Sequence, residues 1–348
     1  MVGTRLKDVA ERAGVSIKTA SNVVRGQGRV GDHTRERVLR AVAELGYQPN
    51  TSARHLRTGR SGIIAFAVPD LTAPYFAELA AQVITAAKKR GRTVLIEDTR
   101  GDPAEELRIA CGLSDPLIDG VLLSPLGLDQ AALAARERHI PLVLLGEQSY
   151  ELPVDHVLID NAAAARRATE HLLSLGRRRI AAVGRPAGPV YATTDQRMYG
   201  YLTALHDAGV PHDPRLVPDT PAFSRPAGAA AVRTLLALDA PPDALFCFND
   251  QLAAGALRAA HEHGLKIPDD LAVVGFDDVE EARFSVPSLT TIAPDKKGIA
   301  ELALDALLRG IDADGQGPSP VLHFADFELM VRESTRPASA ATSGRTGA

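Results

Sequence analysis

Hydrophobic side chains near the amino terminus recur at the three- and four-residue intervals of amphipathic α-helices. The apolar positions of a first helix are Leu6, Val9, Ala10 and Ala13, and those of a second are Ala20, Val23 and Val24. Between them, Gly14 suits the left-handed residue that ends a helix, and Ser16 can accept from the free N–H groups that begin the next. The pattern predicts a tight two-helix corner. The outer face of its second helix would carry Ser16, Ile17, Lys18, Ser21 and Asn22.

Beyond residue 62, short apolar runs alternate with helical segments. The expected strands are 63–68, 93–97, 120–124 and 141–145, and the expected helices are 75–90, 104–113 and 130–138. A second series predicts strands 180–183, 244–248 and 271–276 with helices 162–175, 196–208, 228–238 and 252–263. This alternation predicts two similar α/β halves, each a parallel sheet with helices on both faces. Ligands of such open sheets bind beyond the carboxyl ends of the strands, so we expect a cleft between the halves.

A hinge is expected between the corner and the α/β region. Gln48, Pro49 and Asn50 stop the preceding helix, residues 50–57 allow about two turns of a new one, and residues 58–62 break it. The final residues 337–348 are rich in Ala, Ser, Thr and Gly and lack apolar periodicity. We expect them to form a disordered tail.

The charge of the chain is divided unevenly. Residues 1–60 contain 12 Lys and Arg against 5 Asp and Glu, a net charge of +7, whereas the other 288 residues carry −11. A basic headpiece on an acidic body suits the neutralisation of DNA phosphates. Together with the two-helix corner, whose second helix has the form of a recognition helix, it predicts a helix-turn-helix that reads the major groove. The alternative is a helical cap on an enzyme with an ordinary basic face.

Composition and residue spacing limit which other classes of protein this chain could belong to. The 45% hydrophobic and 24% charged residues are typical of a soluble globular protein. No apolar run approaches the roughly 20 residues of a membrane span, and no signal peptide is recognisable, so a cytoplasmic protein is expected. Cys111 and Cys247 lack metal or redox spacing and should be buried free thiols. His261 and His263 are wrongly spaced for a metal on one helical face, and no nucleotide-binding or nucleophile motif appears. No metal, cofactor or enzymatic activity is expected.

Motifs from residue 4 to about residue 336 resemble the LacI/GalR family of bacterial transcription regulators. The amino-terminal motifs are L-x-D-V-A-x-x-A-G-V-S at 6–16, Y-x-P-N at 47–50 and A-x-x-L at 53–56. Further matches are V-P-D (68–70), D-N (160–161), L-G-R-R-R-I (175–180), R-M-Y-G-Y (197–201), F-N-D (248–250), I-P-D-D-L (267–271), V-G-F-D-D (274–278), L-T-T-I (289–292) and V-R-E-S-T (331–335).

The resemblance implies an all-α headpiece (1–48), a hinge helix and linker (49–60), and a two-lobed, type I periplasmic-binding-protein-like core (61–336) of doubly wound parallel sheets. Its N-lobe would comprise about 61–161 and 293–320, and its C-lobe about 162–292 and 321–336. Such a core senses a small molecule, usually a sugar or related metabolite, and dimerises on a palindromic operator. This chain has Arg177 where the family often has His, and Lys296 near a position that is commonly aromatic. No heptad segment follows Thr335, which favours a homodimer.

The expected DNA contacts lie in the headpiece and the hinge. They are Thr4, Ser16, Ile17, Lys18, Thr19, Ser21, Asn22, Thr34, Asn50, Ala53, Arg54 and Leu56. Lys18 and Asn22 can pair with guanine and adenine edges or hold a phosphate. Ile17 would touch a thymine methyl or rest on its own domain, and Thr34 would hold a phosphate or cap a helix. The resemblance implies that Leu56 wedges into the minor groove, and an ordinary core leucine is the alternative.

The expected effector contacts come from both lobes. They are Asp70, Tyr75, Ser124, Glu147, Tyr191, Thr193, Arg197, Phe223, Asn249 and Asp277. Arg197 and Asp277 match effector positions of the family, and we expect one polar clamp from them. Asp250 would line the pocket or cap the next helix, and Asp278 would be structural. Ordinary loop roles remain the alternative for the N-lobe residues, as core packing does for Tyr191 and Phe223.

These observations predict a sequence-specific transcriptional repressor whose operator affinity changes when a sugar-like effector binds. The competing interpretation is the solute-binding component of a sugar transport system. That class requires a signal peptide and gives no role to Lys18, Asn22 or Leu56. An enzyme is less consistent still, because no nucleophile, base and orienting group assemble in the sequence.

Overall fold

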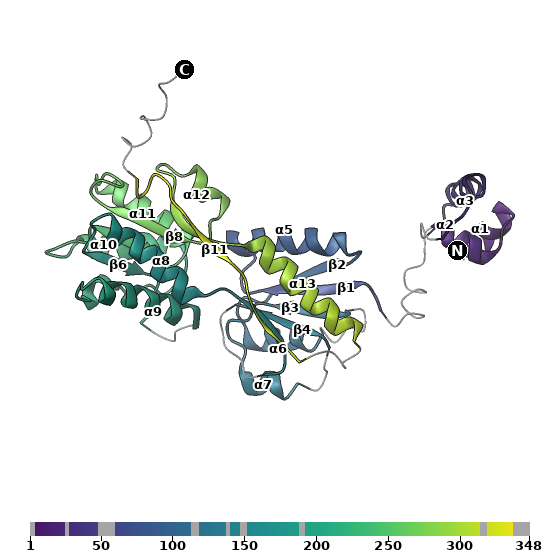
Figure 1. Cartoon of the computed structure of the whole chain (residues 1–348), viewed down its shortest axis with the longest axis horizontal. Coiled ribbons are helices and arrows are strands. Elements are labelled where there is room, and N and C mark those ends of the chain that lie inside the picture. Colours follow the sequence, from purple (N-terminus) through teal and green to yellow (C-terminus); the bar gives the residue numbers. More distant parts are fainter. Residues whose placement is uncertain are drawn as a thin grey trace, which may run out of the picture. The chain divides into compact units, whose positions relative to one another are not determined.

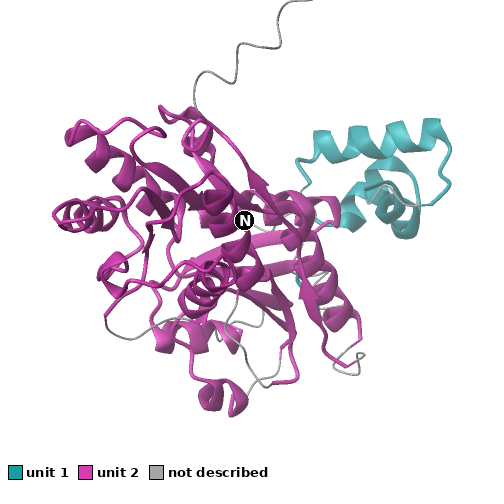
Figure 2. Ribbon diagram, turned by 60° about the vertical axis from the view of Figure 1, so that its left-hand side comes forward, with its two compact units in different colours: residues 1–61 teal, residues 62–348 magenta. Residues whose placement is uncertain are grey.

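The computed structural model describes residues 4–24, 28–47, 60–112, 118–136, 140–146, 152–187, 192–313 and 319–336. The chain divides into two compact units, residues 1–61 and 62–348 (Figure 2). The hinge helix expected over 50–57 and the tail 337–348 lie outside the described residues.

The described part of the first unit is helical. It contains α1 (Leu6–Ala13), α2 (Ile17–Val24) and α3 (Asp32–Glu44). Val9, Ala20 and Val38 come from one helix each and are fully buried together in a small apolar core. The predicted two-helix corner is confirmed, and the third helix packs against both members of it.

The second unit contains two sheets, and we call the half built on the first sheet the N-lobe. Among the described residues its strands are β1 (Ile63–Val68), β2 (Thr93–Asp98), β3 (Gly120–Leu123), β4 (Leu142–Leu145), β5 (Asp155–Leu158) and β10 (Leu322–Phe324). Their order is β10-β5-β4-β3-β1-β2, and each pair is parallel. Helices α5 (Pro74–Lys89) and α13 (Lys296–Asp312) cover one face, and α6 (Pro103–Ala110) and α7 (Gln130–Ala134) the other (Figure 1).

The other half, which we call the C-lobe, has the strand order β11-β9-β8-β7-β6 in its described part. Its strands are β6 (Ile180–Val183), β7 (Ala244–Cys247), β8 (Ala272–Phe276), β9 (Thr290–Pro294) and β11 (Phe327–Met330). Only the pairing of β11 with β9 is antiparallel. The helices are α8 (Asn161–Ser174), α9 (Ala192–Asp207), α10 (Arg225–Leu236), α11 (Asp250–Glu262) and α12 (Glu280–Phe284), with a 3-10 turn η1 (Pro214–Leu216).

Alternate side chains of the N-lobe strands enter different apolar layers. In β1, Ile64 and Phe66 belong to the large cluster that continues into the C-lobe, whereas Ala65 and Ala67 belong to the cluster under α6. Parallel strands that are covered on both faces bury nearly every residue, which explains the continuous apolar runs in the sequence. The carboxyl ends of these strands therefore rest on a packed core.

The chain returns between the lobes later than expected. Strand β10 belongs to the N-lobe sheet and β11 to the C-lobe sheet, so the last crossing follows Phe324. The lobe boundary expected between residues 320 and 321 is therefore wrong by about one short strand. Leu322 and Phe324 of β10 are exposed, so no burial pattern marks this edge strand in the sequence.

Candidate functional site

The turn between α1 and α2 is fixed by hydrogen bonds from each side. Gly14 adopts the left-handed conformation with φ of 62°, and the Ser16 hydroxyl accepts from the Thr19 backbone N–H at 3.1 Å. The Arg37 guanidinium donates to the carbonyls of Ala13 and Gly14, which are free acceptors at the end of α1. The roles predicted for Gly14 and Ser16 are confirmed.

The outer face of α2 carries chemically different side chains. Ile17 is 51% exposed, Lys18 is also exposed, and Ser21 and Asn22 are half-buried. An ammonium, an amide and a branched apolar group thus share one side of a short helix. Base edges in a major groove offer acceptors, donors and the thymine methyl, so this set can read several base pairs.

Other predicted DNA contacts have partners within the headpiece. The Thr4 hydroxyl donates to the Leu45 carbonyl at 3.0 Å, and the hydroxyls of Ser16 and Thr19 are 2.9 Å apart. These contacts support the headpiece itself. They leave oxygen lone pairs for a phosphate or a water.

Thr34 lies inside α3, whose N-cap is Gly31. The alternative that Thr34 caps this helix is therefore wrong, because the helix begins at Asp32, an acidic residue suited to a first turn. The hinge residues expected to contact DNA lie outside the described part of the chain. They are Asn50, Ala53, Arg54 and Leu56.

Arg197 of α9 is the centre of the polar wall of the C-lobe. It is 7% exposed, and its Nε donates to Asn161 Oδ1 at 2.7 Å. Nη1 donates to the Phe248 carbonyl after β7, and the guanidinium carbon lies 3.6 Å from the ring centroid of Phe276 at the end of β8. A planar cation held on three sides keeps one orientation.

Asn249 and Asp250 follow β7 and make different hydrogen bonds. Asn249 is the N-cap of α11, and its Oδ1 accepts from the Leu252 N–H at 2.8 Å. The alternative that Asp250 caps this helix is wrong, because Asn249 supplies the acceptor one residue earlier. Asp250 is 3% exposed and instead accepts from the Val279 N–H at 3.0 Å and the Thr291 hydroxyl at 2.6 Å.

Asp277 and Asp278 form a strained turn after β8. Their φ angles are 114° and 45°, in a region that non-glycine residues rarely adopt. Burial, and next the charge of Asp277, raise the pKa of Asp250 well above its usual range. Asp278 accepts from Arg332 at 2.6 Å and from Arg283 at 3.3 Å. These ion pairs agree with the structural role expected for Asp278.

An ion pair within the N-lobe lies beside this turn, and both of its residues also bond to the C-lobe. Lys296 Nζ lies 2.7 Å from Glu78 Oε2 of α5 and donates to the Asp278 carbonyl at 2.9 Å. The other oxygen of Glu78 accepts from the Glu280 N–H of α12 at 2.7 Å. Lys296 also lies 5.8 Å from the ring centroid of Tyr75. Lys296 thus contacts residues of both lobes.

The N-lobe candidates lie where expected along the chain, at the carboxyl ends of strands. Asp70 follows β1, is exposed, and accepts from the Thr72 N–H at 2.8 Å, which is an ordinary loop role. Tyr75 begins α5, is half-buried, and meets the edge of Phe76 with ring centroids 5.2 Å apart. Ser124 follows β3 and is 8% exposed.

The remaining effector candidates differ in where they lie and in how deeply they are buried. Thr193 lies in the first turn of α9 and is half-buried. Phe223 is half-buried against the large apolar cluster, which agrees with the core alternative. Glu147 and Tyr191 lie outside the described residues.

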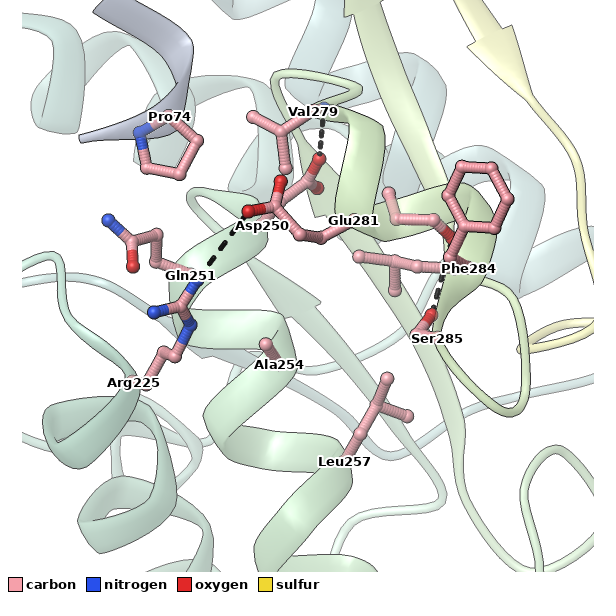
Figure 3. A pocket seen from close by; sticks show the side chains of 12 residues that line it. Pro74, Arg225, Asp250, Gln251, Ala254, Leu257, Val279, Glu281, Phe284 and Ser285 are labelled. Carbon is pink, nitrogen blue, oxygen red and sulfur yellow. Dashed lines mark hydrogen bonds and ion pairs between the residues drawn. The ribbon is translucent and has the colours of Figure 1, made fainter. Parts of the chain in front are cut away.

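A separate groove of about 310 Å³ opens over α11 and α12 (Figure 3). Its lining consists of Pro74, Arg225, Asp250, Gln251, Ala254, Leu257, Val279, Glu281, Ala282, Phe284, Ser285 and Leu289. Of the described residues predicted to line the effector pocket, only Asp250 belongs to this lining. Beside it, Phe284 is 76% exposed and Val286 is 96% exposed.

The sequence interpretation missed several partners. Asn161 and Phe276 fix Arg197, and both belong to motifs that carried the resemblance. Glu78 had no such signal. Arg177 donates to the Asp269 carbonyl at 3.2 Å, so its departure from the family pattern concerns a loop and not the cleft wall.

Other chemical sites are limited within the described residues. No cluster of His, Cys, Asp and Glu there could hold a metal ion, and no described helix is both long and apolar enough to cross a membrane. Cys111 and Cys247 are free as expected, although only Cys247 is fully buried.

Comparisons with known proteins cover nearly the whole chain. A model of the bacterial regulatory proteins of the lacI family matches residues 5–50, and a periplasmic binding protein-like domain matches residues 169–335. The transcriptional regulator DegA of Bacillus subtilis (strain 168) is 36% identical over 340 residues, which is 96% of this chain and 98% of DegA.

Two solved structures share the arrangement. The regulator CelR in complex with cellobiose is 33% identical, covers 95% of this chain and 99% of CelR, and gives a TM-score of 0.70. A lac repressor dimer bound to operator and an anti-inducer is 28% identical, covers 96% and 99%, and gives a TM-score of 0.81. These relatives are regulators, so the comparisons favour a regulator over a transport component.

Proposed function

Because this chain belongs to the LacI family of bacterial regulatory proteins, we propose that it is a cytoplasmic repressor that binds a palindromic operator as a homodimer. The proposal includes a sugar-like effector that binds between the N-lobe and the C-lobe and changes operator affinity. The observation that carries it is the outer face of α2, where Ile17 is 51% exposed next to the exposed Lys18. The division into headpiece (1–48), hinge (49–60) and core (61–336) belongs to the same proposal.

In this proposal, Lys18 and Asn22 read bases, and the neighbouring hydroxyl groups hold phosphates. A side chain that reads a base edge contributes to binding of the cognate sequence and much less to binding of random DNA. A phosphate contact contributes to both.

The test begins with selection of a duplex from a random DNA pool by the full-length protein. Lys18→Ala and Asn22→Ala should each weaken binding of the selected duplex by about 1–3 kcal/mol and change random-DNA binding much less. Lys7→Ala is the matched control, because Lys7 is an exposed cation of α1 that pairs with Glu11. Equal losses on both DNAs would assign Lys18 and Asn22 to phosphates. No enrichment from the pool would contradict the proposed function.

The effector is proposed to lie against Arg197, Asn249 and Asp277 in the C-lobe and against Tyr75 and Ser124 in the N-lobe. Sugar hydroxyls are both donors and acceptors, and a guanidinium beside a carboxylate matches them. The cellobiose complex of CelR supports this class of ligand. A thermal-shift screen of sugars and nucleosides tests it, because a specific ligand stabilises the folded state. A hit whose affinity is unchanged by Asp277→Asn would contradict the role of Asp277.

The dimer contact is proposed to run over the exposed apolar residues next to the groove. Phe284 and Val286 belong to the C-lobe, and Ile84 and Leu95, 43% and 41% exposed, extend the surface in the N-lobe. The solved lac repressor structure that resembles this chain is itself a dimer. Sedimentation velocity on Phe284→Asp should show a monomer, whereas Tyr199→Asp, at a residue 67% exposed on α9, should leave the dimer intact.

A further inference from the structure

Three residues meet at the amino ends of β1, β2 and β3, which are neighbours in the N-lobe sheet (Figure 1). Gly62 precedes β1, Arg92 precedes β2, and Asp119 precedes β3. The strands are parallel, so these residues share one edge of the sheet. The boundary between the two compact units falls directly before Gly62.

The backbone N–H and the carbonyl of Gly62 are both hydrogen-bonded. One carboxylate oxygen of Asp119, Oδ2, accepts from the Gly62 N–H at 2.8 Å and from Arg92 Nη1 at 2.9 Å. The Gly62 carbonyl accepts from the Thr93 N–H at 2.9 Å. Gly62 has φ of 79°, although a Cβ at this position would meet no atom within 4 Å. The glycine is therefore required by the backbone direction and not by lack of space.

The ion pair is largely withdrawn from solvent, with the Arg92 and Asp119 side chains 17% and 5% exposed. Exposed ion pairs contribute little to stability, whereas a desolvated carboxylate that also binds a backbone N–H holds a defined geometry. The opposite ends of β1 and β3 lead to Asp70 and Ser124, two of the candidate effector residues. The chain thus enters the core at the amino ends of these strands, and the candidate effector residues follow their carboxyl ends.

We propose that Arg92 and Asp119 are positioning residues for operator binding, because they fix the point and direction at which the chain enters the core. This inference rests on the proposed function. A dimer that binds two half-sites gains affinity through the effective concentration of its second headpiece, which depends on where the linker is anchored. Release of Gly62 gives the linker more freedom and lowers that concentration. Each headpiece keeps its own contacts with DNA.

The experiment uses full-length protein and the duplex selected from the random pool. Asp119→Asn and Arg92→Met should each weaken binding of the selected duplex on the order of tenfold, with random-DNA binding changed less than about twofold. Asp305→Asn is the matched control. It breaks the ion pair between Arg90 and Asp305 (2.7 Å). Arg90, like Arg92, lies just after α5, but its partner Asp305 belongs to α13 and not to the entry point. This control should bind the selected duplex as the unmodified protein does.

Two further measurements separate positioning from general destabilisation. Gly62→Ala retains the ion pair and strains φ, so it should weaken operator binding in the same direction. Hydrogen exchange of the peptide that contains Gly62 should accelerate in Asp119→Asn and not in Asp305→Asn. Faster exchange with unchanged operator affinity would overturn the positioning role. A pool from which the unmodified protein enriches no duplex would overturn both the proposed function and this inference.

Discussion

The two lobes present their candidate effector residues in different states of constraint. On the C-lobe side, Arg197, Asn249 and Asp277 are 7%, 8% and 9% exposed. Arg197 and Asn249 also make hydrogen bonds within their own lobe. On the N-lobe side, Ser124 is also buried, at 8% exposed, but Asp70 is exposed in a turn and Tyr75 is half-buried at the start of a helix.

This difference follows from how the elements meet. The C-lobe residues come from α9 and from the ends of β7 and β8, and the guanidinium of Arg197 touches both strand ends. Asp70 lies in a connection and bonds to the adjacent Thr72. A wall that is already fixed loses little conformational entropy when a ligand binds. We therefore expect the C-lobe to provide most of the effector affinity and the N-lobe to adapt to the ligand.

The largest expected effect is that of Arg197→Ala. The substitution leaves the oxygens of Asn161 and Phe248 without this donor, and each unsatisfied buried acceptor costs about 1–3 kcal/mol. The free energy of unfolding of the core should fall by that order, as measured by urea denaturation of the full chain.

Asp70→Ala is the comparison variant in the N-lobe. Because Asp70 is exposed and its bonds are local, its loss should change the free energy of unfolding by less than about 0.5 kcal/mol. Equal losses in the two variants would show that the lobes do not differ in constraint.

The next effect concerns pH. The pKa of Asp250 is raised above its usual value of 3.8, first by burial and then by the charge of Asp277. The folded state therefore holds this proton to higher pH than the unfolded state. Stability from the protonated group is complete below pH 3.8 and is lost as the pH rises toward the folded pKa.

Asp250→Asn carries no titrating proton at this position. It should therefore remove the contribution of Asp250 to the change of the free energy of unfolding with pH. The slope for one proton is at most about 1.4 kcal/mol per pH unit. Urea denaturation between pH 4 and 7 measures it, with Asp70→Asn as the N-lobe control that should retain the slope of the unmodified protein. A slope that Asp250→Asn leaves intact would assign the titration to another group.

Much of the fold was predictable because burial left a local signal. Strands β1 and β6 occur at the residues predicted from their apolar runs. Strand β5 was missed because it begins with Asp155 and His156. Strand β10 was missed because two of its residues are exposed at a sheet edge. Edge strands and polar starts lack the continuous apolar run that marks a covered parallel strand.

The candidate site was predictable only one residue at a time. Arg197 and Asp277 could be singled out from motifs, whereas the contact between Arg197 and Asn161 joins α9 to α8 and has no local pattern. Asn249 and Asp250 are adjacent, and either side chain can cap a helix, so their roles depend on which one reaches Val279. Long-range pairing is the information that the local sequence lacks.

The last expected effect concerns the N-lobe ion pair that lies against the C-lobe turn. Glu78 and Lys296 are 30% and 13% exposed at the side chain, intermediate between surface and buried pairs. A double-mutant cycle of Glu78→Gln and Lys296→Met should therefore give a coupling energy of about 1 kcal/mol in urea denaturation. The cycle for Arg233 and Glu262, an exposed pair at 2.9 Å with side chains 51% and 36% exposed, should give a smaller value.

Salt sharpens this last comparison, because screening weakens exposed pairs more than partly buried ones. The coupling of Glu78 with Lys296 should persist in 1 M NaCl while that of Arg233 with Glu262 disappears. Lys296 also holds the Asp278 carbonyl, and Glu78 holds the N–H of Glu280, so the pair ties the constrained turn of the C-lobe to α5 of the N-lobe. A coupling near zero would mean that Glu78 and Lys296 act independently of each other on the C-lobe turn. A coupling that changes on addition of the ligand found by the thermal-shift screen would show that ligand binding acts on this ion pair.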